Sequence, residues 1–172
     1  MSFGFTHLII AWFAGKVYQF ATRKKIRQKA WFFLLLGGVL PDIDFLLDWT
    51  LGTELHRTFT HSLFFVVVAP LLVYLLFRFL GNKNSFSFMY AIAGGIMTHL
   101  MMDMFFSAGV PLFWPSLLHF SYTSVTYFDP ATPSFLNAAA PALRRFLESA
   151  LVDMALGVSW IFYLWSRKRI QF

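Results

Sequence analysis

The sequence predicts an all-α membrane protein, a polytopic helix bundle of about five spans with a proline-rich outer cap. Its 172 residues are 58% hydrophobic and only 13% charged, with a mean hydropathy of +0.63. A soluble domain of this length would carry far more charge on its surface. Apolar runs of membrane-spanning length recur along the chain, and basic residues stand beside them. We expect residues 1–172 to form a single membrane-embedded domain.

Five apolar runs are the candidate spans. They cover about residues 4–22, 30–47, 61–80, 86–107 and 142–166. Pro41 interrupts the second run near its end. The connection 108–141 is too broken for a helical span, and we expect it to form a surface or re-entrant cap. Its prolines are Pro111, Pro115, Pro130, Pro133 and Pro141.

The charged residues divide between the two ends of these spans. Basic residues gather at 23–29, at Arg78 and Lys83, and at 167–169, whereas the acidic residues fall on the other half. The positive-inside rule then places the N-terminus outside the membrane, the C-terminus in the cytoplasm and the acidic end on the outer side. Because the basic residues flank apolar runs, they indicate the lipid bilayer as the partner, and not nucleic acid. The chain has no cysteine, which excludes disulfides and thiolate metal sites.

Four of the runs bring an ionisable side chain to about the same depth. With a helical rise of about 1.5 Å per residue, Asp42 and His99 lie roughly 18 and 20 Å from the basic end. His61 and His7 come out near roughly 25 Å by the same rise. Ionisable groups at membrane depth are energetically unfavourable and usually face the bundle interior, where they are paired or functional. We therefore expect these residues to meet in the outer leaflet.

The types and spacing of these residues suit a metal ion. His99 and Asp103 are four residues apart, which puts them about 40° apart on one helix face. Asp42 and Asp44 are two carboxylates so close together that a cation is expected to neutralise their repulsion. Histidine and carboxylate ligands without sulfur suit zinc, manganese or iron, with zinc favoured, and enough ligands are present for one ion or two. The alternatives are a His99–Asp103 hydrogen bond that ties two helices together and a solvated loop at Asp42.

The stretch 56-HRTFTHS-62 is the most polar segment beside an apolar run. His61 is expected to be a metal ligand, and His56 a base, an acid or a second ligand. Arg57 offers a planar fork for a phosphate or carboxylate, or else is an ordinary interfacial arginine. Thr60 is a natural N-cap for the helix that follows, with Ser62 as another partner for its free amides.

Other polar residues are weaker candidates. His119 lies in the predicted cap, and Asp153 in the fifth run is either a partner that supports a metal ligand or a helix–helix contact. Trp114 and Pro115 are expected to shape the entrance for a substrate. The serine and threonine cluster 121–126 lacks a nucleophile-elbow motif, so we do not expect a serine nucleophile.

Taken together, the motifs resemble a known family. They are His7–Leu8, 40-LPDID-44, 56-HRTFTHS-62, 99-HLMMD-103 and 109-GVPLFWP-115. In this order, over about residues 3–116, they resemble the YdjM-like family of LexA-regulated, inner-membrane metal-dependent hydrolases, which is distantly similar to the zinc-dependent phospholipase C family. The resemblance implies an inner-membrane location and metal ligation by His7, Asp42, His61, His99 and Asp103. Only His119 and Asp153 follow, with a spacing that departs from the downstream ligands of the phospholipase family and argues against a full three-zinc cluster.

The predicted function is a membrane-bound metal-dependent hydrolase that opens to the outer face. It would cleave a phosphoester or related ester, in a lipid-borne or small-molecule substrate, by metal-activated water. Asp44 or His56 would move the proton, and Arg57 together with the metal would stabilise developing negative charge.

Two non-enzymatic functions remain as alternatives, a structural metal site and a metal-ion transporter. A transporter needs ionisable residues throughout the membrane depth, but the inner half of the spans carries no acid and only Lys16 and Arg78 near it. A structural site is coordinatively closed, whereas more polar groups gather here than four ligands require. Both comparisons favour catalysis.

Overall fold

The computed structural model describes residues 4–51, 58–106, 109–116, 118–127 and 140–167. Within these residues the chain is mostly helical, as predicted, and it also contains a short antiparallel hairpin. The helices are α1 (Gly4–Thr22), α2 (Gln28–Val39), α3 (Ile43–Leu51), α4 (Leu63–Phe79), α5 (Ser85–Phe106) and α6 (Ala140–Ser166). A 3-10 turn, η1 (Phe59–His61), precedes α4, and the hairpin strands are β1 (Leu118–Phe120) and β2 (Val125–Tyr127).

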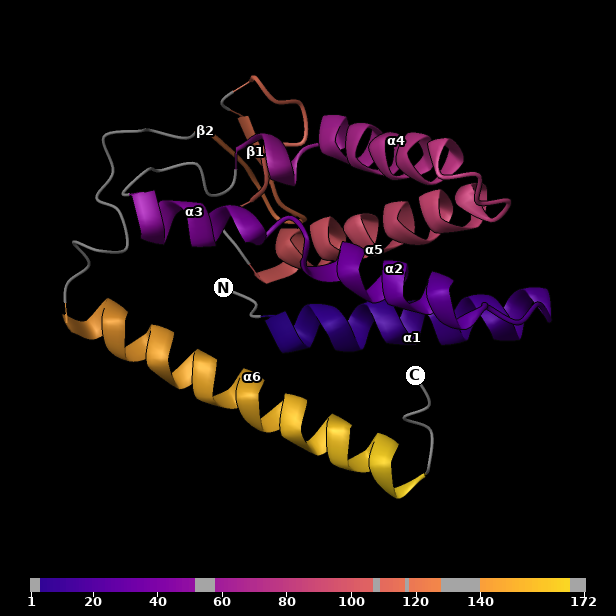
Figure 1. Cartoon of the computed structure of the whole chain (residues 1–172). Coiled ribbons are helices and arrows are strands. Elements are labelled where there is room, and N and C mark those ends of the chain that lie inside the picture. The colour runs from indigo at the N-terminus through magenta and orange to yellow at the C-terminus, as the bar shows by residue number, and fades with distance from the viewer. Residues whose placement is uncertain (1–3, 52–57, 107–108, 117, 128–139, 168–172) are drawn as a thin grey trace.

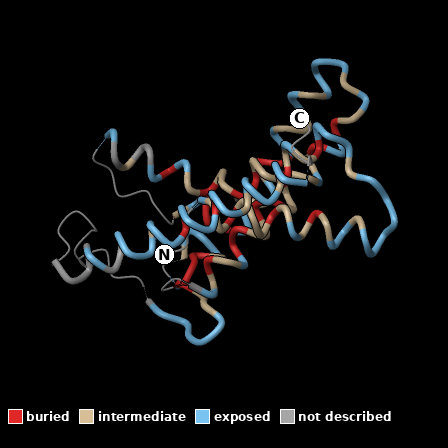
Figure 2. The backbone as a smooth tube through the Cα atoms, turned by 90° about the horizontal axis from the view of Figure 1, so that it is seen from below, coloured by how far each residue is buried: buried red, intermediate tan, exposed pale blue. Residues whose placement is uncertain are grey.

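The helices run back and forth between the two ends of an elongated bundle. α1, α2, α4 and α5 lie side by side, and each of them reverses the direction of the one before it (Figure 1). α5 packs against α1, α2 and α4, whereas α6 packs against α1. Figure 2 shows the buried residues concentrated along the middle of this bundle, and mostly exposed residues on the outlying segments. The central position of α5 explains why the site described below is built on it.

Exposed apolar side chains on the long helices agree with a membrane environment. Phe20 on α1, Phe79 on α4 and Trp165 on α6 are exposed by 89%, 90% and 68%. Such surfaces are unfavourable in water but suit lipid. By length and composition, Ser85–Phe105 and Leu147–Ser166 could each cross a membrane, and Leu63–Phe79 is a shorter apolar helix. The full set of about five spans therefore stays a prediction.

The second predicted span is not one continuous helix. α2 ends at Val39, and α3 begins only at Ile43. Pro41 stands in the turn between them and has no backbone N–H with which to continue the helix. The twelve residues of α2 cover about 18 Å, short of the roughly 30 Å of a bilayer core. The interruption predicted at Pro41 is confirmed, and the break places Asp42 in a turn that faces α5.

Glycines allow α2 and α5 to touch through their backbones. A Cβ atom on Gly95 of α5 would lie 2.1 Å from the Leu34 carbonyl oxygen of α2. A Cβ atom on Gly37 would lie 2.4 Å from the Ile92 carbonyl oxygen. Gly38 faces α1, where its Cβ would lie 2.9 Å from the Cβ of Ala11. These close contacts bring α1, α2 and α5 together beside the site.

The described part of the predicted cap forms the hairpin and the loop before it. Leu118 pairs with Tyr127 and Phe120 with Val125. Val110 forms an isolated antiparallel bridge with Phe120, which folds the loop onto β1. The loop also joins α4, because the Leu63 amide donates to the Leu112 carbonyl over 3.0 Å. Pro130 and Pro133 lie outside the described residues, so the proline-rich character of the cap stays a prediction.

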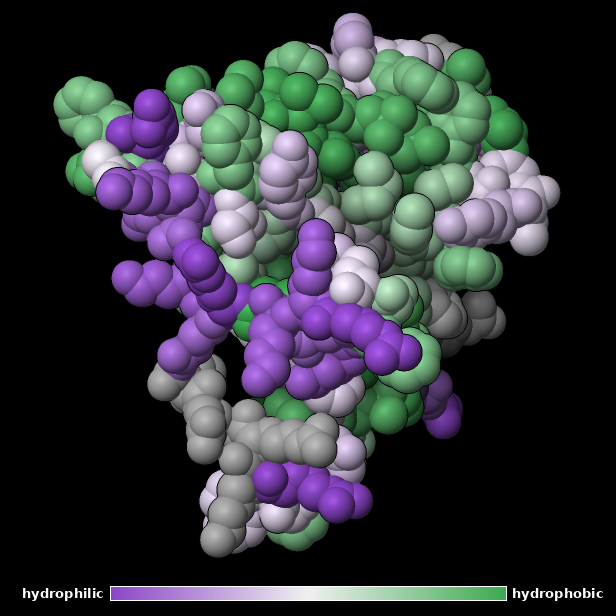
Figure 3. Space-filling model, turned by 90° about the vertical axis from the view of Figure 1, so that its right-hand side faces the viewer, coloured by the Kyte–Doolittle hydropathy of each residue, from purple (hydrophilic) through white to green (hydrophobic). Residues whose placement is uncertain are grey.

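Hydrophilic side chains gather at the end of the molecule where α1 ends and α2 begins, as Figure 3 shows. The basic segment 23–27 joins these two helices there. Arg27 donates a hydrogen bond to Asn84 in the α4–α5 connection, so two of the connections at this end are linked. The acidic residues Asp42 and Asp103 lie near the opposite ends of their helices. These two acidic residues therefore lie at the end of the bundle away from the basic segment 23–27.

Candidate metal centre

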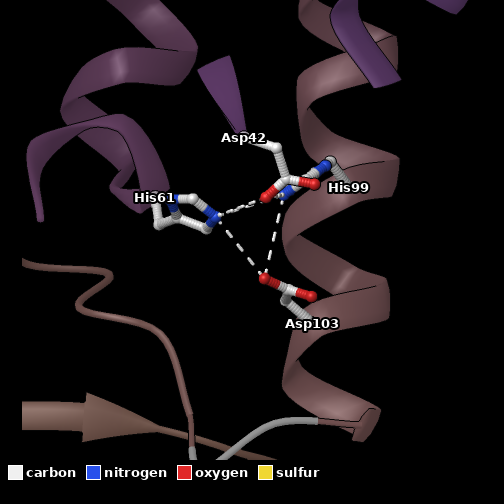
Figure 4. A group of neighbouring side chains, drawn as sticks. All are labelled: Asp42, His61, His99 and Asp103. Atoms are coloured by element: carbon white, nitrogen blue, oxygen red, sulfur yellow. Dashed lines mark hydrogen bonds and ion pairs between the residues drawn. The ribbon is translucent and has the colours of Figure 1, made fainter. Parts of the chain in front are cut away.

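Four side chains from three elements meet in the interior. Asp42 comes from the α2–α3 turn, His61 from the end of η1, and His99 and Asp103 from α5 (Figure 4). One ligand atom from each residue lies within 4.8 Å of those from the other three. His61, His99 and Asp103 are buried. We call this set the four-residue site; it unites four of the five predicted metal ligands.

The distances within the four-residue site suit a single small cation. Asp42 Oδ1 lies 3.5 Å from His61 Nε2 and 3.5 Å from His99 Nε2. Asp103 Oδ2 lies 3.5 and 3.8 Å from the same nitrogens, and the two nitrogens are 3.2 Å apart. Zinc–ligand bonds of about 2.0–2.1 Å in a tetrahedron would separate the ligand atoms by about 3.3 Å. The side chains therefore fit a divalent ion without a large rearrangement.

The hydrogen bond behind His99 sets its tautomer. His99 Nδ1 lies 2.9 Å from the Gly38 carbonyl oxygen, which can only accept, so Nδ1 carries the proton. In the neutral ring, Nε2 then has a free lone pair directed at the two aspartates. Backbone carbonyls commonly orient metal-binding histidines in this way. The short α2–α5 contact at the glycines makes this hydrogen bond possible.

His61 is oriented by a second carboxylate. Asp44 Oδ2 lies 3.5 Å from His61 Nδ1, on the side of the ring away from the four-residue site. The Thr60 hydroxyl donates to Asp44 and lies 3.0 Å from the same nitrogen. Asp44 and Thr60 are both buried. A carboxylate behind a metal-binding histidine fixes the ring and raises its basicity.

His7 on α1 lies against the other side of the two aspartates. Its Nε2 is 3.5 Å from Asp103 Oδ1 and 3.9 Å from Asp42 Oδ2, the oxygens that do not face His61 and His99. Its ring stacks on the ring of His99, with centroids 3.8 Å apart and an interplanar angle of 20°. The predicted meeting of α1 with the other ligand-bearing segments is therefore present.

Access to the four-residue site differs among its members. The side chain of Asp42 is 29% exposed, whereas the side chains of His61 and His99 are fully buried and that of Asp103 is 3% exposed. Asp42 is therefore the member of the four-residue site that reaches the surface.

The remaining predicted residues fall into three groups. His56 and Arg57 lie outside the described residues, so their roles stay predictions. His119 is buried on β1 and is not part of the four-residue site. Asp153 is buried on α6 and accepts hydrogen bonds from the first turn of α1, which is the predicted helix–helix contact.

The N-cap of α4 is Ser62, the alternative to Thr60 in the prediction, and its hydroxyl accepts from the Phe65 amide. The contact of the Thr60 hydroxyl with Asp44 was not anticipated from the sequence. Thr60 directly precedes His61, which marks it as a neighbour of the site. Its partner Asp44 lies sixteen residues away, so local spacing could not predict this contact. Trp114 is exposed, and the centroid of its ring lies 6.2 Å from the ring centroids of Phe59 and Phe64. It therefore lies near η1, the element that carries His61.

The fold and the site define a helical membrane protein with a buried histidine–aspartate group that can hold a metal ion. The chain matches the sequence profile of the family described as YdjM inner membrane protein over residues 1–170, and it belongs to that family. Family membership supports location in the inner membrane. No curated protein and no solved structure matches the chain significantly.

Proposed function

We propose that the four-residue site binds a divalent metal ion and that the protein is a membrane-bound metal-dependent hydrolase. The observation that carries the proposal is the convergence of two imidazole nitrogens and two carboxylate oxygens, at separations of 3.2–3.8 Å for the five pairs given above. Zinc is the favoured ion, and manganese or iron can use the same ligands. When bound, the ion would polarise a phosphoester or ester oxygen and activate a water molecule.

The residues of the chain have distinct roles in this proposal. Asp42, His61, His99 and Asp103 hold the ion, and His7 is a further ligand from the opposite side of the two aspartates. Because both aspartates direct one oxygen to each side, the arrangement has donors for one ion or two. Asp44 contacts His61 Nδ1 on the side of the ring away from the four-residue site, so a positioning role suits it better than the predicted proton transfer.

The proposed substrate is a phosphoester or related ester in a lipid-borne molecule. Support comes from the position of the site at one end of a bundle whose helices carry exposed apolar side chains. A lipid in the outer leaflet could bring its ester group to this end without leaving the bilayer. Arg57 is proposed to bind the negative charge of the ester, and His56 to move a proton.

Elemental analysis of detergent-purified protein tests the metal site first. We expect stoichiometric metal in the wild type, and its loss in His61→Ala and Asp103→Ala without loss of folded protein. Glu148→Gln is the matched control, because Glu148 is an exposed acid paired with Arg144 and distant in sequence from the site. Wild-type protein without metal, under any loading condition, would overturn the proposal.

A substrate screen then separates an enzyme from a protein with a structural metal. The metal-loaded wild type is mixed with phosphoester lipids in micelles and with water-soluble phosphoesters of the same leaving group. We expect hydrolysis of the lipid esters that is lost in Asp103→Ala. Bound metal together with no turnover of either substrate class would support the structural alternative.

A further inference from the structure

We propose that Asp153 of α6 is a positioning residue that fixes the first turn of α1 and thereby holds His7 against Asp42 and Asp103. The contact is geometric and does not require a metal ion. Its consequence for metal binding rests on the proposed function of the four-residue site. The test below is therefore made on metal-free protein, so that the two proposals can fail separately.

The side chain of Asp153 caps a helix that belongs to another part of the sequence. Its Oδ1 accepts from the Thr6 amide over 2.7 Å and from the Thr6 hydroxyl over 2.5 Å. Its Oδ2 accepts from the Phe5 amide over 3.1 Å. The first amides of an α-helix have no partner within their own helix, and the positive end of the helix dipole favours a carboxylate. α1 has no acidic residue in its own first turn, so α6 supplies one.

Packing around Asp153 aligns the two helices. The Phe5 ring lies so close to Gly157 that a Cβ atom there would be 2.3 Å from the ring. Further along, Trp12 and Trp160 make an edge-to-face contact with centroids 6.1 Å apart. Only 11% of the apolar segment Leu147–Ser166 of α6 is buried. Within the described chain, α6 thus joins the bundle through α1, and Asp153 makes the hydrogen bonds of that junction.

The first turn of α1 leads directly to the metal centre. His7 follows Thr6, and its Nε2 lies 3.5 Å from Asp103 and 3.9 Å from Asp42. On the other side of the helix backbone, the His7 carbonyl oxygen lies near Gly38 of α2. If the first turn of α1 frays, the ring of His7 moves away from the aspartates. His61 and His99, which are carried by η1 and α5, keep their positions.

A buried carboxylate in an apolar helix would be unfavourable without such a partner. Asp153 is buried, whereas most of the exposed side chains of α6 are apolar. Hydrogen bonds to a charged group contribute more than bonds between neutral groups. A neutral asparagine could keep part of the hydrogen bonding but would lose the interaction with the helix dipole. The negative charge of Asp153 therefore favours a role in fixing the first turn of α1 over a role in helix association alone.

Chemical modification of histidines measures the effect directly. Metal-free, detergent-purified protein is treated with diethyl pyrocarbonate, and the modification rates of His7, His61 and His99 are followed separately by mass spectrometry. In Asp153→Ala we expect His7 to react at least about tenfold faster than in the wild type, as the loss of hydrogen bonds to a charged group implies. Asp153→Asn should give a smaller increase, and His61 and His99 should stay slow. Glu148→Gln, which removes another acid from α6, should leave all three rates unchanged.

Two results would overturn the inference. In the first, His7 stays as unreactive in Asp153→Ala as in the wild type. In the second, all three histidines become reactive together, which would show that Asp153 only supports overall stability. If Asp153→Ala does not fold, Asp153→Asn replaces it, because asparagine keeps one acceptor oxygen for the first turn of α1 and loses the charge. A selective increase at His7 in Asp153→Asn supports the inference, and an unchanged rate overturns it.

Discussion

Replacing Gly95 by alanine should separate α2 from α5 and weaken metal binding. The added Cβ atom would lie 2.1 Å from the Leu34 carbonyl oxygen and 2.8 Å from the Gly37 Cα. Ordinary contacts of this kind begin at 3.4 Å, so the backbones must move apart by roughly 1 Å. Both crowded partners are backbone atoms, which cannot rotate away as a flexible side chain could. Overpacking of this kind typically costs about 1–3 kcal/mol of folding stability.

The same movement would disturb the four-residue site. Gly38 lies next to Gly37, and its carbonyl oxygen is 2.9 Å from His99 Nδ1. A shift of roughly 1 Å would lengthen this bond beyond the range of about 2.7–3.2 Å for N–H···O bonds. It would also draw Asp42, which follows α2, away from the ligands on α5. Loss of a residue that orients a ligand typically reduces metal affinity about 10–100-fold, and we expect Gly95→Ala to fall within this range.

The assay compares Gly95→Ala with Gly94→Ala. At Gly94 a Cβ atom would meet only the Leu34 Cδ1 atom, at 3.5 Å, so this neighbouring change should be tolerated. Zinc affinity is measured by competition with a fluorescent chelator, and stability by thermal unfolding in detergent. Wild-type zinc affinity in Gly95→Ala would refute the reasoning, because it would show that the α2–α5 contact does not set the geometry of the site. Equal losses in both variants would refute it as well.

Two further predictions concern the support of His61 and the orientation of the chain. Thr60→Val removes the hydroxyl that binds Asp44 and His61, and should lower zinc affinity about tenfold. Thr98→Val is its control, because among the described residues the Thr98 hydroxyl bonds to Gly95 of its own helix; equal affinities would contradict the role of Thr60. The distribution of basic residues predicts that an impermeant thiol reagent labels Thr123→Cys from outside the inner membrane and labels Lys25→Cys only after permeabilisation. The native chain has no cysteine to interfere, and the reverse labelling would invert the proposed orientation.

Part of the site could be predicted from the sequence because two of its residues lie on one helix and the other two lie close to the end of a helix. The spacing of His99 and Asp103 places both on one helix face, and counting residues from the basic end brought Asp42 and His61 to a similar depth. These are local quantities, set by helical rise and periodicity. The apolar composition and the separation of charges likewise indicated a membrane protein before any contact was known. Family membership supports that class.

Other features depend on contacts between distant parts of the chain. Asp42 and Asp44 are two residues apart, yet one joins the four-residue site and the other lies behind His61, because α2 ends at Val39 and α3 starts in a new direction. Continuous helical periodicity across Pro41 could not predict this division. The same applies to Thr60, which binds Asp44 and does not cap α4.

By itself, the sequence determined the class of protein, the charge at each end of the bundle and the residue types that can bind a metal ion. The tertiary structure alone decided which carboxylate joins the four-residue site, that Gly95 of α5 lies against the backbone of α2, and that Asp153 caps α1. The physical reason is the range of the interactions. Helical rise, hydropathy and charge act along the chain, whereas hydrogen bonds and backbone contacts act through space between segments as much as 148 residues apart.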